Sequence, residues 1–493
     1  MGKLWEKTYS LDALVEAFTV SDDPVIDARL VNADCVASMA HATMLASIGI
    51  LSEADGNALV KELGAIIDLN GKGRFSIQRS DEDVHTAIEN HLVRALGDAG
   101  KRIHTGRSRN DQVLTALRLW NRGFLQSFQG ACLDLVNRLL DLAQANEKTP
   151  MPGRTHMQTA MPSSVGLWAA AFAEELLDDV ALARGAFAIT DCCPLGSAAS
   201  YGVPLSLDRQ LVSDLLGFAR VQNNVLYANN SRGKFEAIAL EAVEHVALTL
   251  GRLAQDLILF SLPELGYFTL PQELCSGSSI MPQKRNPDGL ELVRARASAI
   301  AADLMAVKAV TRSLPSGYNR DFQETKAPFF RGCETGLACV RVMDLTMEKL
   351  VVNGDRLRAA FAPDIFATDR ALEMVAEGVP FREAYRKVGM DLASGGGRDL
   401  SVGGRGPSGA SLGGGDLSLA GRDPVEAISK RTSLGAPGNL RLQIPRAAAA
   451  GFAEELARMS AEKRKKITAL AGREVELFRD PLAAGTGGSS RSP

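Results

Sequence analysis

The segment with the densest set of reactive side chains covers residues 277–287 and reads GSSIMPQKRNP. It begins with small residues and two hydroxyls, and it then brings Lys284 and Arg285 next to an Asn-Pro step. Asn286 is expected to cap a following helix, with Pro287 at the first helical position. Two cations beside a helix N-terminus would suit a carboxylate. The alternative is an ordinary polar loop before a capped helix, and the local chemistry leaves both interpretations open.

Three other segments are rich in polar groups and lack an apolar pattern. Residues 152–158, PGRTHMQ, contain His156, a residue type that transfers protons near neutral pH. Residues 104–112, HTGRSRNDQ, place two arginines at a helix start, where their forked donors suit a small polyanion. Residues 316–326, SGYNRDFQETK, offer donors and acceptors at irregular spacing. Taken singly, residues 152–158 and 316–326 also fit polar surface segments, and residues 104–112 also fit a solvated helix cap.

A short acidic run, Asp81-Glu82-Asp83, precedes His85 and raises the question of a metal site. No matching second cluster accompanies it, so we interpret the run as a solvated helix start and expect no metal.

Helical periodicity dominates the rest of the chain, with apolar residues three and four positions apart, so the predicted fold is mostly α. Several of the periodic segments exceed an ordinary globular helix, which favours a bundle. The longest are residues 34–50, 121–146, 167–187, 234–260 and 287–311.

The predicted organisation has three helical domains and a tail. They are an N-terminal domain (1–105), a central long-helix bundle (106–355), a C-terminal domain (356–475) and the tail (476–493). Within the third domain, residues 394–422 hold eleven glycines and few apolar residues, so this stretch is predicted to be a disordered insertion.

Composition narrows the classes of protein. The chain has 55 basic and 58 acidic residues, a formal net charge of −3, which argues against nucleic acid or a membrane surface as partners. No signal core or transmembrane span is recognisable. Seven cysteines without a CxxC pair are typical of reduced thiols, so a cytoplasmic location is expected.

Together, these segments resemble the fumarase/aspartase superfamily of β-eliminating lyases, whose signature loop GSSIMPQKRNP matches. HTGRSRNDQ, PGRTHMQ and SGYNRDFQETK are similar to the argininosuccinate lyases within it. Further matches are AHATML, EDVHTAIE, PLGS, GVPFREAY and RTSLGAPGNL, so the resemblance covers about residues 10–475 apart from the glycine-rich stretch. An adenylosuccinate-type lyase of the same superfamily and an inactive crystallin-like structural protein remain as alternatives.

The resemblance implies a cofactor-free lyase that splits argininosuccinate into arginine and fumarate. It also implies a mostly α-helical homotetramer whose active sites draw loops from three subunits. By motif position, His156 and Ser278 resemble the catalytic pair, Glu291 the carboxylate beside that histidine, and Lys284 a cation of the mobile signature loop. Substrate contacts are expected from Ser21, Arg109, Asn110, Thr155, Asn286, Tyr318, Gln323 and Lys326.

The chain departs from the resembling motifs in three places. Arg154 stands where PGYTHMQ usually has tyrosine. The usual LWGGRF start reads LWEKTY, and the stretch usually like SDRDF reads SRGKF at residues 231–235, without an acidic residue beside Arg232. These departures bear on substrate contacts more than on the reaction.

The implied chemistry explains why such groups are needed. Removing a proton next to a carboxylate creates a dianion, which needs cations and oriented dipoles nearby. Lys284 and a helix N-terminus fit that need, and Lys284 with loop amides would stabilise a Ser278 alkoxide. His156, tuned by Glu291, would serve the leaving guanidine.

Overall fold

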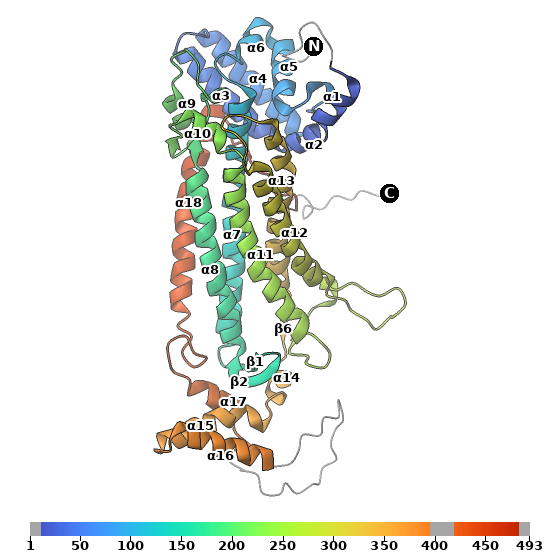
Figure 1. Ribbon diagram of the computed structural model, residues 1–493, viewed down its shortest axis with the longest axis vertical. Coiled ribbons are helices and arrows are strands. Elements are labelled where there is room, and N and C mark those ends of the chain that lie inside the picture. Colours follow the sequence, from blue (N-terminus) through green and yellow to red (C-terminus); the bar gives the residue numbers. More distant parts are fainter. Residues whose placement is uncertain (1–10, 395–418, 483–493) are drawn as a thin grey trace.

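The computed structural model describes residues 11–394 and 419–482, and it is an elongated bundle of helices (Figure 1). Shorter helices gather at the upper end of the bundle in that view. They are α1 (Ala13–Val20), α2 (Asp23–Asp27), α3 (Val31–Ser47), α4 (Glu53–Gly71), α5 (Val84–Leu96) and α6 (Asp98–Arg102), joined there by α9 (Arg209–Leu216) and α10 (Val225–Asn230).

Five long helices form the body of the bundle and confirm the predicted mostly α fold. They are α7 (Arg109–Ala145), α8 (Val165–Thr190), α11 (Lys234–Phe260), α12 (Asp288–Thr311) and α13 (Lys326–Lys349). α7 is the longest, with 37 residues, and it begins at a reciprocal capping box between Ser108 and Asp111. Buried leucine, alanine, valine and phenylalanine side chains from these helices form one continuous core.

An aromatic cluster ties the end of the described chain to that core. Trp120 on α7 packs edge-on against Phe330 at 4.6 Å and against Phe478 at 5.2 Å between ring centroids. Phe478 is only 7% exposed and lies close against Gly123 of α7. Part of the segment predicted as a tail therefore packs into the core.

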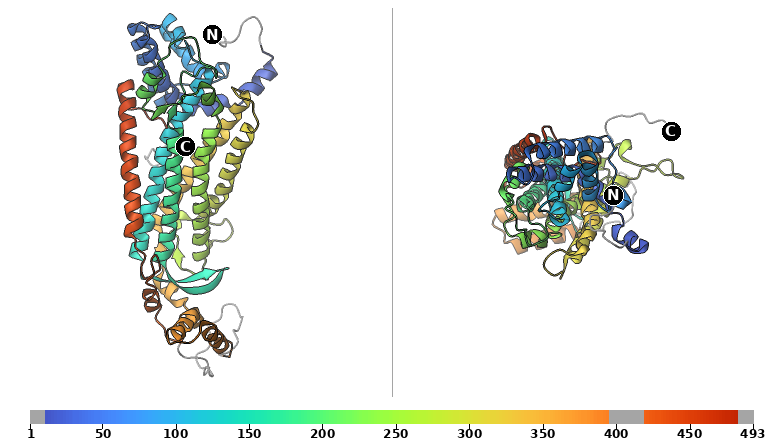
Figure 2. Two further views of the ribbon diagram at one scale, coloured as in Figure 1. Left: turned by 60° about the vertical axis from the view of Figure 1, so that its left-hand side comes forward. Right: turned by 90° about the horizontal axis from the view of Figure 1, so that it is seen from above.

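The C-terminal part leaves the bundle and then returns to it (Figures 1 and 2). α14 (Gly354–Ala359), α15 (Ala367–Ala376), α16 (Phe381–Ser394) and α17 (Pro424–Ser429) lie at the lower end. α18 (Gln443–Ala471) runs back along the bundle and packs against α7, α8, α9 and α3. The domain boundaries at 105, 355 and 475 remain predictions.

Most of the predicted glycine-rich insertion lies outside the described residues. At its far edge, Leu419 is buried, and Arg422 donates to both carboxylate oxygens of Glu373 at 2.8 and 2.7 Å. Residues 419–422 therefore contact the rest of the described chain, and the bounds of the insertion, 394–422, remain predictions.

Among the described residues, strands are few and short, and they form three two-stranded sheets. β1 (Pro150–Thr155) and β2 (Gln158–Ser164) make an antiparallel hairpin at the lower end of the bundle. β3 (Cys192–Cys193) pairs in parallel with β4 (Arg220–Val221), and β5 (Phe268–Thr269) pairs antiparallel with β6 (Val351–Val352). Among the helices that the structure describes, none has the length and apolarity to cross a membrane.

Candidate active site

A polar pocket lies at the upper end, where α2, α5, the start of α7 and the segment before α13 meet. We call it the upper pocket. Five residues predicted to contact substrate line it, although they come from two distant segments of the chain: Arg109, Asn110, Tyr318, Gln323 and Lys326. The remaining lining residues are Asp23, Asp27, Glu82, Asp83, His85, Val113, Arg232 and Arg320.

Lys326 is the most strongly held of the predicted residues. It is 3% exposed, and its Nζ lies 2.7 Å from Asp27 and 2.9 Å from Asp23. Burial by itself would lower the pKa of Lys326, but the two carboxylates outweigh that effect and raise it. The pKa of Asp23 rises to about 6, chiefly because of burial. Lys326 and its two carboxylate partners therefore form a buried ion cluster that lines the upper pocket.

Arg109 and Asn110 begin α7, so backbone amides of the helix N-terminus lie beside their side chains. Arg109 donates to Glu82 at 3.0 Å and to Thr86 at 2.6 Å. Asp111, the next residue, is fully buried and accepts from the amides of Gly196 and Ala198. These two hydrogen bonds fix the PLGS loop, residues 194–197, to the start of α7. The start of α7 forms one wall of the upper pocket.

Glu82 and Asp83 of the acidic run line this pocket, and the prediction of the run as a solvated helix start was only half right. Asp83 does cap α5, accepting from the Thr86 amide at 2.8 Å. Glu82 and His85, however, are only 6% and 5% exposed. His85 is buried because α5 packs against α3, where Asp34 accepts from His85 Nδ1 at 2.9 Å, and Glu82 lies against the Arg109 guanidinium. Within residues 11–394 and 419–482, no group of His, Cys, Asp and Glu is placed to hold a metal ion.

His85 is a pocket residue that the sequence interpretation missed. Burial lowers its pKa, but Asp34 and further acids nearby reverse this, so the pKa is raised overall. The matching motif EDVHTAIE and the position of His85 directly after the acidic run were the signals that could have pointed to it. Arg232 and Arg320 lie in segments that the sequence analysis had singled out, whereas Asp23 and Asp27 carried no such signal, because their approach depends on how separate elements pack.

Two other predicted residues lie on the β1–β2 hairpin, which we call the His156 hairpin (Figure 2). Thr155 pairs with Gln158, so His156 and Met157 form a two-residue loop. Both loop residues have positive φ, 53° and 64°, as a type I′ turn requires. For residues other than glycine, such conformations cost on the order of 1–3 kcal/mol each. The predicted catalytic histidine is therefore presented, exposed, at the tip of a strained turn.

Residues 275–287, here the Ser278 loop, project from the side of the bundle before α12 (Figure 1). The loop is closed by a backbone bridge between Ser276 and Asn286, with bonds of 3.0 and 2.9 Å. The expected capping role of Asn286 is therefore wrong: Pro287 occupies the N-cap position, and no side chain caps α12. Asn286 lies one residue before the N-cap position of α12, and the backbone pairing with Ser276 holds it there.

Within this loop, Ser278 Oγ accepts from two backbone amides, Ile280 at 3.4 Å and Met281 at 3.1 Å. Lys284 is exposed on the same loop. Donors directed at a hydroxyl oxygen favour its deprotonated form.

The single chain does not bring all predicted residues together. His156, Thr155, Ser278, Lys284 and Asn286 do not line the upper pocket. Glu291 is exposed in the first turn of α12, and neither its side chain nor that of His156 has a hydrogen bond or ion pair among the contacts of the described residues. Ser21 ends α1 and is exposed outside the pocket lining, whereas the nearby Thr19 carbonyl accepts from Arg320 and Gln323.

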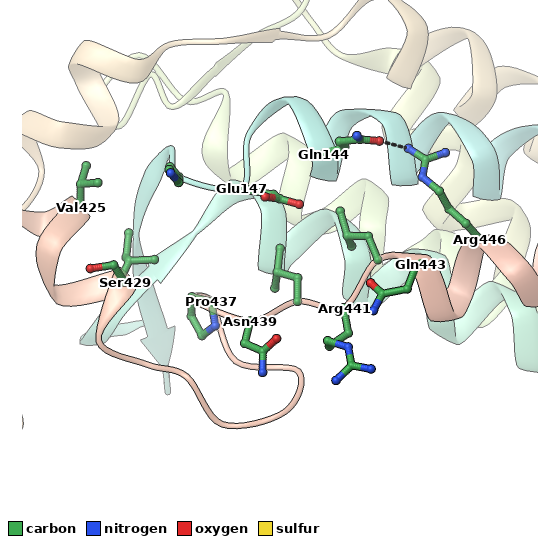
Figure 3. Close-up of a pocket in the computed structure, with 14 residues that line it drawn as sticks. Gln144, Glu147, Val425, Ser429, Pro437, Asn439, Arg441, Gln443 and Arg446 are labelled. Atoms are coloured by element: carbon green, nitrogen blue, oxygen red, sulfur yellow. Dashed lines mark hydrogen bonds between the residues drawn. The ribbon is translucent and has the colours of Figure 1, made fainter.

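A larger cavity of about 520 Å³ lies elsewhere, between the end of α7, α17 and the segment before α18 (Figure 3). No predicted site residue lines it. Its wall includes the end of the RTSLGAPGNL motif, where Gly438 is needed because a Cβ would come within 2.7 Å of the Arg431 carbonyl. Arg431 also binds Asp369 of α15 at 2.6 Å. The RTSLGAPGNL motif therefore has a structural role, because it connects α17 to α18 and contacts α15.

Comparison with known proteins places the chain in a class. A family model described as lyase matches residues 6–301. Among solved structures, EDDS lyase in complex with formate aligns with a TM-score of 0.75 and 22% identity, covering 94% of this chain and 95% of that one. A class II fumarase from Schistosoma mansoni aligns with a TM-score of 0.63 and 17% identity, covering 78% and 93%. The fold and the family model define a lyase with the fumarase/aspartase architecture.

Sequence relatives narrow the class. The argininosuccinate lyase of Sorangium cellulosum (strain So ce56) is 46% identical over 440 residues, which is 89% of this chain and 96% of that protein. That of Stenotrophomonas maltophilia (strain K279a) is 42% identical over 445 residues, 90% of this chain and 98% of that protein. The chain belongs to the argininosuccinate lyase family.

Proposed function

We propose that this enzyme is a carbon–nitrogen lyase that converts argininosuccinate into arginine and fumarate, a step of arginine biosynthesis in the cytoplasm. In this reaction a base takes a proton from the carbon beside a carboxylate of the succinyl part. The electron pair of that C–H bond forms the C=C bond of fumarate, and the C–N bond to the guanidine breaks. No electrons are exchanged with a cofactor, so none is required.

One observation carries the proposal: five residues expected to contact substrate, from two segments far apart in the sequence, line a single pocket. That pocket combines Arg109, Arg232, Arg320 and Lys326 with four carboxylates. Such a mixture suits a ligand that bears both carboxylates and cationic nitrogen groups, as argininosuccinate does.

The reacting groups are assigned to the two exposed elements. Ser278 is the base, because the Ile280 and Met281 amides already donate to its oxygen. Lys284 and the N-terminus of α12 stabilise the dianion that follows proton removal. His156, paired with Glu291 of another subunit, serves the departing guanidine by proton transfer or by hydrogen bonding.

We further propose a homotetramer in which different subunits supply the upper pocket, the His156 hairpin and the Ser278 loop. Two features support this. The upper pocket encloses about 170 Å³, less than the roughly 300–1,000 Å³ of typical small-molecule sites. In addition, the long helices expose large apolar side chains, Leu248 (54%), Leu292 (51%), Met305 (56%) and Leu345 (42%), which would be covered in an assembly.

Purified protein incubated with argininosuccinate tests the reaction, with fumarate absorbance as the measurement. We expect steady fumarate release and an equal amount of arginine. Adenylosuccinate is the matched comparison substrate, and it should not be turned over. Turnover of adenylosuccinate alone would indicate a different lyase of the same fold, and a folded tetramer inactive on both would indicate a structural, crystallin-like protein.

A further inference from the structure

Arg154 is the residue at which this chain departs from the PGYTHMQ motif, and it lies two positions before His156. Its guanidinium makes two hydrogen bonds. NH1 donates to the Met157 carbonyl at 3.2 Å, and NH2 donates to the Tyr267 hydroxyl at 3.3 Å. One side chain thus joins the turn at the tip of the His156 hairpin to Tyr267, the residue directly before β5.

Tyr267 is a firm anchor for this link. It is 1% exposed, and its ring stacks on Phe260 with 5.8 Å between centroids. Its backbone amide donates to the Phe260 carbonyl, and its carbonyl accepts from the Asn353 amide, each at 2.9 Å. Tyr267 is therefore fixed by its ring and by its backbone on both sides.

The turn, by contrast, needs support from outside. His156 and Met157 both have positive φ and are exposed. Neither is asparagine or glycine, the residues that favour a two-residue turn of this kind. Such a conformation persists only where surrounding contacts impose it. The bond from Arg154 to the Met157 carbonyl is a contact of that kind, made to the turn itself.

We propose that Arg154 is a positioning residue for His156: it ties the strained turn to Tyr267 and so fixes the direction of the imidazole. The inference rests on the proposed function, in which His156 serves the departing guanidine. Arg154 does not touch the reacting atoms in this account. Its effect passes through the backbone of the turn.

The test compares steady-state kinetics of wild type with Arg154→Met, which keeps an apolar stem and removes both donors. We expect kcat to fall roughly tenfold, because small displacements of a reacting group are costly. KM should change less than about threefold, since the groups of the upper pocket are untouched. Arg154→Lys should regain part of the loss, because an ammonium can still donate to one acceptor.

Two further variants separate positioning from general stability. Tyr267→Phe removes only the anchor's acceptor and should lower kcat less than Arg154→Met does. The double variant should be no worse than Arg154→Met, because both changes break one link. Arg220→Met is the matched control: the Arg220 guanidinium likewise donates two hydrogen bonds, to the Ala188 and Ile189 carbonyls, both at 3.3 Å, but far from the hairpin in sequence. It should keep wild-type kcat.

The outcomes are distinct. If wild type releases fumarate from argininosuccinate and Arg154→Met keeps its kcat, the positioning role is wrong while the proposed function stands. If kcat falls only in parallel with melting temperature and with loss of assembly, the role is structural and the inference is also wrong. If wild type itself releases no fumarate, the proposed function fails, and the inference fails with it.

Discussion

The upper pocket and the two exposed elements differ in how their polar groups are held. In the upper pocket, Lys326 and Arg109 are already paired with carboxylates, and these pairs lie on buried scaffolding. On the His156 hairpin and the Ser278 loop, the predicted reacting side chains are exposed or only partly buried. The binding groups are thus prearranged within one chain, whereas the reacting groups are presented outward.

This difference has a physical reason. Buried ions need partners, because an unpaired buried charge costs several kcal/mol, so a pocket of buried cations must be built together with its acids. Groups that transfer protons must instead reach the substrate, and they are commonly carried on loops. An enzyme with shared active sites would combine the two by bringing the loops of one subunit to the pocket of another.

The largest expected effect comes from removing the reacting groups. Ser278→Ala and His156→Asn should each lower kcat by roughly 10²–10⁴-fold, the range for positioned proton-transfer groups. Both side chains lie on surface elements, so circular dichroism and melting temperature should match wild type. Ser279→Ala, one residue along the same loop, is the control and should stay active. Near-native turnover by either variant would remove that residue from the mechanism.

The comparison is sharpened by removing a lysine from each region. Lys326→Met leaves Asp23 and Asp27 buried without their cation, and it should destabilise the protein by about 3–5 kcal/mol. Lys284→Met, on the exposed loop, should leave the melting temperature unchanged while lowering kcat. Thermal melts with parallel kinetics measure both effects. Equal melting temperatures for the two variants would contradict the contrast between a paired and an exposed cation.

The pH dependence of Lys326→Met adds a check on the same cluster. The pKa of Asp23 is already raised to about 6, chiefly by burial. A carboxyl whose pKa is higher in the folded than in the unfolded protein stabilises the fold when the pH lies below the unfolded pKa. This stabilisation is lost as the pH rises through the folded pKa. Without Lys326, the variant should therefore be least stable at pH 8 and recover toward pH 5. A melting temperature that falls toward pH 5 relative to wild type would oppose this.

A smaller effect is expected from a buried histidine on α3. His41 is fully buried, its Nε2 donates to the Thr105 carbonyl, and burial lowers its pKa to about 3. As pH falls, the unfolded chain takes up the proton first, so stability is lost below about pH 6.5, by about 2 kcal/mol at pH 5. His41→Gln should lose less melting temperature between pH 8 and pH 5, whereas His245→Gln, at an exposed position, should follow wild type. Parallel curves for His41→Gln and wild type would contradict this assignment.

Much of the fold could be predicted from the sequence, because long amphipathic helices carry their own signal. The predicted segment 234–260 coincides with α11, and 287–311 differs from α12 by one residue. Phe478 shows the limit: nothing local in the tail indicates that this ring packs on Trp120, since the contact depends on α18 running back along the bundle.

The site could be predicted only where motifs exist. Arg109 and Lys326 were found because their segments resemble known ones, and they do meet in one pocket. Asp23 and Asp27 were missed because their ion pairs with the buried Lys326 form only when α2 lies against the start of α13. The assignments of His156, Ser278, Lys284 and Glu291 remain proposals, since each depends on contacts that a single chain does not contain.

The central claim, a site assembled from different subunits, is tested most directly with hybrids of two inactive variants. His156→Asn carries a defect in the His156 hairpin, and Ser278→Ala carries one in the Ser278 loop. The two proteins would be dissociated, mixed and reassembled, with hybrids verified by native mass spectrometry. Random mixing would leave about a quarter of the sites free of both defects, so activity should return to about a quarter of wild type. Hybrids that form and stay as inactive as their parents would contradict shared sites.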